Sequence, residues 1–271
     1  MNATDFEYDG HNLSDFGFVI CDLDGSNGVV TVDAGSQITF NKVSRHNGKR
    51  YSLTSTSYDN CIEATFQICK DPCKYDDISM TKDEYRDIMR WLNRNKFYKF
   101  RLIDDEYFGR DTCYYDASFN IDKLLVDDKL YGLQLNMVTN RPFGYGEENR
   151  YEFNVTSSSD VLKVYDISDE IGRMYPNITI NVKSDGNLTI TNTTYNSVMV
   201  INNCSAGELI TVNGDTMVVT TSLNSHKIYK DFNFEYMIIA NTYNNRLNEI
   251  TVSLPCEITF SYSPIIKDSP N

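Results

Sequence analysis

Three of the seven cysteines lie close together in the sequence, at Cys61, Cys69 and Cys73. Thiolates at short spacing can hold zinc or form a redox pair, but a structural zinc site usually combines two such pairs or adds histidines. Cys69 and Cys73 are the one closely spaced pair of this kind. We therefore interpret these cysteines as structural thiols, and a metal site or a redox pair is the alternative interpretation.

Histidines and carboxylates are the other groups that could do chemistry. None of the three histidines, His11, His46 and His226, lies in a zinc-protease helix motif or a nucleophile elbow. A glycosidase needs two carboxylates that face each other across a cleft, whereas adjacent acids in turns point apart. The adjacent acids are Asp76-Asp77, Asp104-Asp105, Asp127-Asp128 and Glu147-Glu148. No glycine-rich phosphate loop is present either, so we expect no catalytic residue, no metal, no cofactor and no enzymatic activity.

The composition describes a globular and acidic protein. The 271 residues are 41% hydrophobic and 13% aromatic, which suits about two domains at roughly 150 residues each. The net charge of −13 disfavours direct binding to nucleic acid or to anionic membranes. An odd, scattered set of cysteines and the lack of a signal-peptide pattern lead us to expect folding in a reducing cytoplasm.

One amphipathic helix is predicted over residues 81–94, in a sequence that otherwise predicts strands. Thr81 and Glu84 have the spacing of a capping box, which satisfies two backbone donors at a helix start. The apolar residues that follow recur with helical spacing and form one stripe. A lone amphipathic helix must cover a sheet here. We therefore expect the helix to contribute four core residues, Tyr85, Ile88, Trp91 and Leu92.

The residues around this helix predict an α+β domain over residues 1–145. Alternating stretches such as Ile62–Ile68 and Tyr98–Ile103 are typical of half-buried strands, and Tyr114–Ile121 and Leu130–Val138 predict two more strands. Proline and glycine then interrupt the pattern near Arg141–Glu148. Beyond this boundary the sequence shows about eight short strands and no helical period. We predict a β-sandwich of jelly-roll type over residues 146–271.

A basic stretch stands out in the acidic sequence, with Arg45, His46, Lys49 and Arg50 around the turn signal Asn47-Gly48. The plain interpretation is a solvated hairpin loop. The functional interpretation is an assembly arm, because a basic loop on an acidic protein gives complementary charge between copies. We favour the assembly arm if copies of the chain form a ring.

Several short motifs resemble the distal tail protein (Dit) family of long-tailed bacteriophages. In the first half the similar motifs are Phe6-x-Tyr8-x-Gly10, Phe16-Gly-Phe-x-Ile20, Arg90-Trp-Leu92, Asp104-Asp-Glu-Tyr107, Tyr115-Asp-Ala117, Tyr131-Gly-Leu133 and Pro142-Phe-Gly-Tyr145. In the second half they are Gly172, Pro176–Ile180, Gly207–Gly214, Asn248–Val252 and Ile258–Pro264. Asn213 and Arg246 depart from the family pattern, which has Asp and Gly there.

This resemblance implies a structural virion protein. It implies a mainly β fold, with an N-terminal split-barrel-like α+β domain that forms a ring and a C-terminal galectin-like sandwich. Members of the family form homo-hexameric rings at the tail tip, joining the tail tube protein to the tail-associated hub protein and to receptor-binding or baseplate proteins. The resemblance also implies assembly in the host bacterial cytoplasm.

Two other functions stay open. The sandwich could be a carbohydrate-binding module for host surface glycans, because sugar sites stack an aromatic ring and surround it with polar side chains. The candidate contacts are Tyr195, Tyr229, Tyr243 and Arg246. A fold alone does not transfer a sugar site. The third interpretation is a related tube or baseplate component of the same virion.

Overall fold

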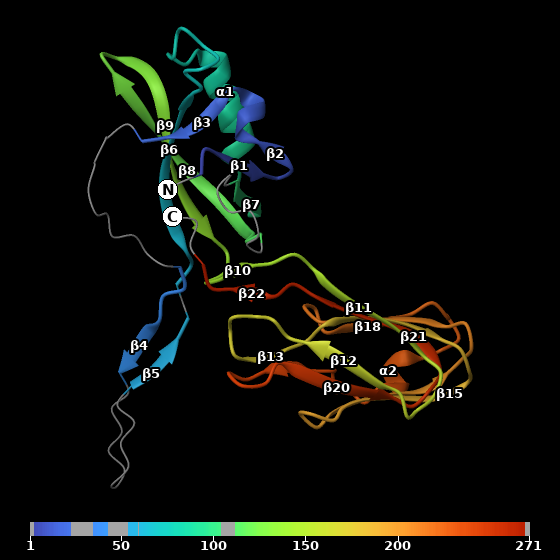
Figure 1. Cartoon of the computed structure of the whole chain (residues 1–271). Coiled ribbons are helices and arrows are strands. Elements are labelled where there is room, and N and C mark those ends of the chain that lie inside the picture. Colours follow the sequence, from blue (N-terminus) through green and yellow to red (C-terminus); the bar gives the residue numbers. More distant parts are fainter. Residues whose placement is uncertain (1–2, 23–34, 43–53, 59, 104–111, 269–271) are drawn as a thin grey trace. The chain divides into compact units, whose positions relative to one another are not determined.

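The computed structural model describes residues 3–22, 35–42, 54–58, 60–103 and 112–268. The chain forms two compact units, one of residues 1–146 and 266–271 and the other of residues 147–265 (Figure 1). The chain thus returns to the first unit after it leaves the second. No helix among the described residues is both long and apolar enough to cross a membrane.

The first unit is built on one antiparallel sheet of seven strands. Across the sheet these are β2 (His11–Asn12), β1 (Asp5–Tyr8), β7 (Tyr98–Ile103), β8 (Tyr115–Val126), β9 (Lys129–Thr139), β6 (Glu63–Lys70) and β3 (Phe18–Cys21). Burial alternates along β6, as predicted for a half-buried strand. The backbone N–H of Ile20 in β3 donates to the carbonyl of Thr4, just before β1, at 2.9 Å. The sheet therefore curls until strands from its two sides meet, as in a split barrel.

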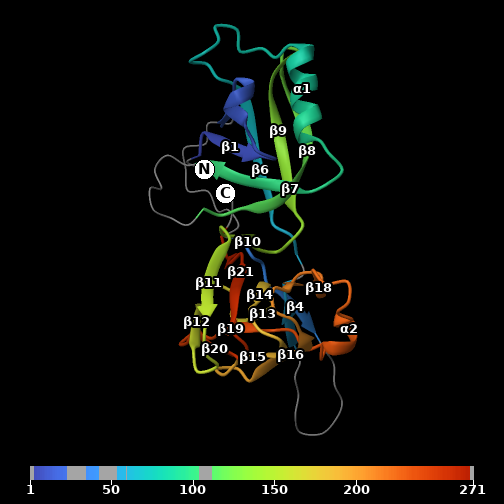
Figure 2. The same cartoon turned by 90° about the vertical axis from the view of Figure 1, so that its right-hand side faces the viewer.

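The predicted helix is α1 (Lys82–Leu92), and it packs against β8 (Figure 2). Thr81 is its N-cap, and the capping box between Thr81 and Glu84 is present. Asn93 ends the helix, with its backbone N–H donating to the carbonyl of Met89. The buried face of α1 consists of Ile88, Trp91 and Leu92. The strong periodicity of this segment explains why its type and its start were predictable.

Short elements complete the first unit. A 3₁₀ turn, η1 (Leu13–Phe16), leads from β2 into β3. The strands β4 (Thr39–Lys42) and β5 (Thr54–Ser57) pair with each other in an antiparallel hairpin of their own. Two further short strands, β10 (Gly144–Tyr145) and β22 (Ile265–Ile266), lie at the two ends of the first unit's boundary in the sequence.

The second unit is a β-sandwich. One sheet has the order β11 (Asn149–Val155), β21 (Cys256–Tyr262), β14 (Asn177–Val182), β17 (Leu209–Asn213) and β18 (Val218–Thr221). The other has the order β12 (Val161–Tyr165), β20 (Leu247–Val252), β15 (Gly186–Asn192) and β16 (Ser197–Cys204). Alternate residues of both sheets enter one shared core. A further pair joins β13 (Gly172–Met174) to β19 (Ile239–Asn241).

The prediction of a mainly β chain with one long helix is confirmed. The expectation that the second half contains no helix is wrong in one place, because Ile228–Asp231 form the short helix α2. Four residues make little more than one turn, which is too short to produce a helical period in the sequence.

Candidate functional site

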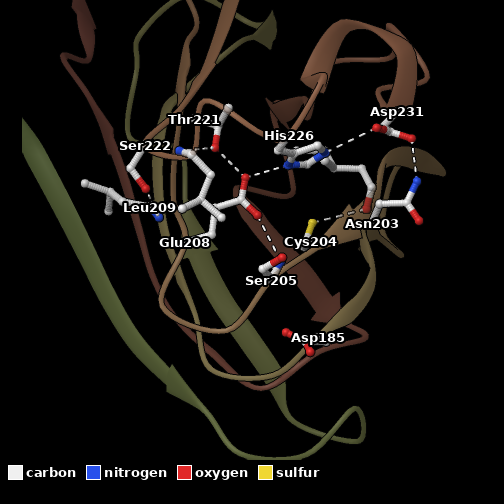
Figure 3. Close-up of polar contacts among 12 residues, drawn as sticks. Asp185, Asn203, Cys204, Ser205, Glu208, Leu209, Thr221, Ser222, His226 and Asp231 are labelled. Atoms are coloured by element: carbon white, nitrogen blue, oxygen red, sulfur yellow. Dashed lines mark hydrogen bonds and ion pairs between the residues drawn. The ribbon is translucent and has the colours of Figure 1, made fainter.

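The most deeply buried charged site among the described residues lies in the second unit, around Glu208, His226 and Asp231 (Figure 3). Glu208 directly precedes β17, His226 lies in the loop after β18, and Asp231 ends α2. The side chain of Glu208 is fully buried and that of His226 is 4% exposed. Three segments that are separate in the sequence therefore meet through ionisable side chains.

Hydrogen bonds stabilise the charged form of Glu208. Its Oε1 accepts hydrogen bonds from the hydroxyl of Thr221 and from Nδ1 of His226, and its Oε2 accepts one from the backbone N–H of Ser205 at 2.9 Å. Burial alone would raise the pKa of Glu208, but these hydrogen bonds outweigh it and lower the pKa below its usual range. The carboxylate thus stays ionised inside the sandwich.

Both ring nitrogens of His226 face carboxylates. Nδ1 lies 2.5 Å from Oε1 of Glu208, and Nε2 lies 3.5 Å from Oδ2 of Asp231. The second contact is too long to satisfy Nε2 as a hydrogen bond. Asp231 is itself held by the side-chain amide of Asn203 at 2.6 Å. The ring of His226 thus lies between the two acids and bonds to Glu208, which fastens the loop after β18 to the strands beside α2.

The cluster lacks an activated nucleophile. The neighbouring thiol of Cys204 donates to the carbonyl of Ile201 at 3.4 Å. Burial, together with the charge of Glu208, raises the pKa of Cys204 to about 11, so its thiol stays protonated at neutral pH. The hydroxyl of Thr221 is already engaged by Glu208. The cluster of Glu208, His226 and Asp231 can therefore hold its three segments together.

Sequence reasoning missed this cluster, although a signal was present. Glu208 alternates with Ile210 and Val212, which both lie in the core. Residues two apart on a strand face the same side, so the alternation places a carboxylate in the apolar layer. A buried carboxylate needs a hydrogen-bonding or charged partner, and His226 is a candidate for it in the sequence.

The four candidate glycan contacts lie on three separate segments. Tyr195 is in the turn between β15 and β16, and Tyr243 and Arg246 are in the turn between β19 and β20. Tyr229 is on α2, which contacts β16 and β18. Tyr243 and Tyr229 are 87% and 60% exposed, while Arg246 donates to the carbonyl of Ser168 at 3.0 Å. The hydroxyl of Tyr195 is buried without a hydrogen-bond partner.

The predicted assembly loop lies outside the described residues. Arg45, His46, Lys49 and Arg50 belong to the segment between β4 and β5 in the sequence. The four expected core residues lie on α1. Ile88, Trp91 and Leu92 are buried, and Tyr85 is partly buried at the margin of the core.

The groups that could have formed a metal site are dispersed. Cys61 and Cys73 are exposed, whereas the thiol of Cys69 forms a hydrogen bond with that of Cys21 on the neighbouring strand β3. All seven cysteines are free thiols. Within the described ranges, no group of three or more His, Cys, Asp or Glu side chains could hold a metal ion.

Comparisons with known proteins give the family. Residues 1–141 match the family described as phage tail protein N-terminal domain, and residues 143–262 match the one described as phage tail C-terminal domain. A protein of Bacillus subtilis (strain 168), the SPbeta prophage-derived uncharacterized protein YomH, is 24% identical over 184 residues. That match covers 65% of this chain and 67% of YomH.

A solved structure shares the fold of the whole chain. The crystal structure of the Dit (gp 19.1) protein of phage SPP1 matches with a TM-score of 0.62 and 13% identity, over 96% of this chain and 98% of that chain. That protein is described as a paradigm of the hub adsorption apparatus in phages that infect Gram-positive bacteria. At this identity the likeness concerns the fold. The chain belongs to this family of phage tail proteins, and it has the fold of a distal tail (Dit) protein.

Proposed function

We propose that this phage tail protein is the distal tail hub of its virion. In this role it links the tail tube to the tail-associated hub protein and to receptor-binding or baseplate proteins at the tail tip. The observation that carries the proposal is the fold match to the SPP1 hub protein, which covers 96% of the chain and thus both units in order.

The proposed hub is a closed ring of six copies formed by the first unit. Heterologous contacts between identical copies avoid open fibres only when they close into a ring. The strand β8 supports this proposal. It pairs with β7 only along Tyr115–Ala117, so from Asn120 to Val126 the described strands leave one of its edges without a strand partner. An open edge of this kind is a natural template for a strand of a neighbouring copy.

The proposed role involves no catalysis and no direct binding to nucleic acid or membranes. The cluster around Glu208 has a protonated thiol and an engaged hydroxyl in place of a nucleophile. The net charge of −13 repels phosphate backbones. In a ring, the same charge would prevent DNA from adhering to the lumen. The proposal also places assembly in the host cytoplasm, where free thiols persist.

Immunogold labelling of intact phage particles tests the position of the protein. An antibody against the purified chain should label one site, at the end of the tail distal to the capsid. Label along the full length of the tail would instead identify a tube protein, and label on the capsid would contradict a role at the tail tip. An antibody against the tube protein provides the matched control for accessibility along the tail.

A further inference from the structure

Phe234, in the second unit, is a large apolar residue that is both exposed and held in a rare backbone conformation. It is 61% exposed, and its φ angle is +59°. In this left-handed region Cβ of an L-residue crowds the following carbonyl oxygen, so bulky residues are outliers there. Such strain persists only where the surroundings enforce it, and it often marks a functional site.

The preceding residue, Asn233, enforces this conformation. Its backbone N–H donates to the carbonyl of Val200, and its side-chain Oδ1 accepts from the backbone N–H of Val200, each at 3.1 Å. Its Nδ2 donates to the carbonyl of Val198 at 3.1 Å. Oδ1 also accepts from the N–H of Glu235 at 3.2 Å. Asn233 therefore clamps the segment to the outer edge of β16 and fixes the direction of Phe234.

Phe234 is one end of a connected set of four rings, which we call the aromatic ridge: Phe234, Phe232, Tyr236 and Tyr175. The buried ring of Phe232 lies 5.4 Å from that of Phe234 and 5.1 Å from that of Tyr236. Tyr175 meets Tyr236 edge to face at 6.5 Å and is 43% exposed. The exposed ring of Phe234 thus rests on the buried ring of Phe232, and the ring of Tyr175 rests on the partly buried Tyr236, so little conformational entropy is lost when a partner covers them.

Apart from the carboxylate of Glu235, the polar side chains of residues 232–236 already form hydrogen bonds within the protein. The amide of Asn233 has bonds at both its oxygen and its nitrogen, and the hydroxyl of Tyr236 donates to the carbonyl of Met217. A saccharide presents many hydroxyls that lose water on binding and need polar partners in return. An apolar protein surface has no such requirement. The chemistry of the aromatic ridge therefore favours a protein partner over a glycan.

The charged side chains near the aromatic ridge indicate which charges the partner should carry around its apolar patch. Glu235 follows Phe234 directly, and Asp215 lies in the turn that contains the acceptor of Tyr236; both residues are exposed. Two exposed cations, Lys230 and Arg173, lie two residues before Phe232 and Tyr175, so the acidic side chains are those nearest in sequence to Phe234. The chain as a whole carries a net charge of −13. Complementary potentials speed encounter and exclude wrong partners, so cationic side chains are expected around the partner's apolar patch.

We propose that the aromatic ridge is a docking surface for a protein partner with an apolar pocket and a cationic rim, and that Phe234 enters this pocket. The inference rests on the proposed function, since the partner is then another component of the tail. Large aromatic residues at the centre of an interface typically dominate its binding energy. The strained and exposed position of Phe234 is then explained by what binds there.

The first test separates docking from a structural role of Phe234. Glycine and asparagine tolerate a positive φ, so Phe234→Gly and Phe234→Asn relieve strain while they remove the ring. If Phe234 serves docking, the melting temperature of either variant in the purified full-length chain should be no lower than that of the unaltered protein. A clear drop in both would show that the ring stabilises the sandwich, and it would overturn the proposal.

The second test identifies the partner in assembled particles. The photoreactive residue p-benzoylphenylalanine is placed at position 234 or, as a matched control, at position 243, where Tyr243 is 87% exposed but belongs to a different turn. Irradiated phage particles should give a covalent adduct with one tail protein from position 234 and none with that protein from position 243. Mass spectrometry of the adduct identifies the partner and its contact residue.

Binding of the purified pair completes the test. The Kd should rise about thirtyfold with Phe234→Asn, as for the loss of a hot-spot side chain. It should also rise with salt, because the rim charges are screened. An unchanged Kd, the absence of an adduct, or binding to neutral saccharides that depends on Phe234 would overturn the proposal. If the variant chain still enters tail tips, such a result leaves the hub function intact.

Discussion

Trp91 is held from three sides in the first unit. Its ring stacks on Phe16 and Phe6 at centroid distances of 4.4 and 5.6 Å, and its indole N–H donates to the carbonyl of Tyr8 at 3.0 Å. Stacked aromatic pairs stabilise beyond their buried area, and a buried indole N–H needs an acceptor. Trp91 therefore joins α1 to both β1 and η1.

We expect Trp91→Ala to destabilise the first unit by about 3–5 kcal/mol, because it removes both stacked contacts and leaves a cavity. Trp91→Phe keeps an aromatic ring and should reduce the stability less, by about 1–3 kcal/mol, because it leaves the carbonyl of Tyr8 unpaired and has a smaller ring. Urea unfolding followed by circular dichroism gives both values. Equal stability of the alanine variant and the unaltered protein would show that Trp91 is not part of the core.

The pH dependence of stability at Glu208 follows from its lowered pKa. A carboxyl whose pKa is lower in the folded state stabilises the fold above its unfolded pKa of about 4.3 and loses that contribution as the pH falls through the folded value. We expect Glu208→Gln to reduce stability at pH 7 by about 1–3 kcal/mol. The difference from the unaltered protein should shrink as the pH falls below about 4.3.

Unfolding curves measured at a series of pH values test this prediction. Glu152→Gln is the control, because Glu152 lies on the exposed face of β11 and pairs with Arg150 at the surface. Its effect at pH 7 should be much smaller than that of Glu208→Gln. A gap between Glu208→Gln and the unaltered protein that stays constant down to pH 3 would contradict an ionised Glu208 in the fold.

At the scale of elements, the hairpin of β8 and β9 shows where sequence patterns succeed and fail. The predicted strands Tyr114–Ile121 and Leu130–Val138 are both present, but β8 continues to Val126. A register shift between Leu124 and Leu125 interrupts the two-residue alternation there. Because strands are recognised from that alternation, the end of the strand was missed while its centre was predicted.

The turn of this hairpin offers a stabilising substitution. Asp127 and Asp128 both have positive φ, at +47° and +62°, as in the tight turns that suit a twisted hairpin. Asp128→Gly creates an Asp-Gly turn and should stabilise the first unit by about 0.5–1 kcal/mol. Trp91, the single tryptophan, reports unfolding of this unit by fluorescence.

Asp122→Gly is the matched control for the turn. Asp122 lies within β8 and accepts a hydrogen bond from the side-chain amide of Asn136 on β9 at 2.8 Å. Glycine in a strand interior loses this bond and adds conformational freedom to the unfolded chain, so the control should be less stable than the unaltered protein. If Asp128→Gly destabilises the first unit as much as Asp122→Gly does, the result contradicts a turn with positive φ at Asp128.

At the scale of the whole molecule, strong local signals explain what was predictable. The capping box at Thr81 and the stripe on α1 lie within one segment, and the hydrophobic alternation of the sandwich strands lies within each strand. The cluster of Glu208, His226 and Asp231 joins three segments, and the ridge from Phe234 to Tyr175 joins two. No single segment carries the pattern of these contacts, so they become visible only in the folded unit.

Assembly of the hub is the most consequential claim at this scale. The edge of β8 that has no partner among the described strands and the family's tail function support contacts between identical copies, and a ring is the closed solution for such contacts. The most direct test is negative-stain electron microscopy of the purified chain at micromolar concentration, with light scattering on the same sample. We predict closed rings of six copies with a central opening. A monomer at every concentration, or open stacks without closure, would contradict the hub.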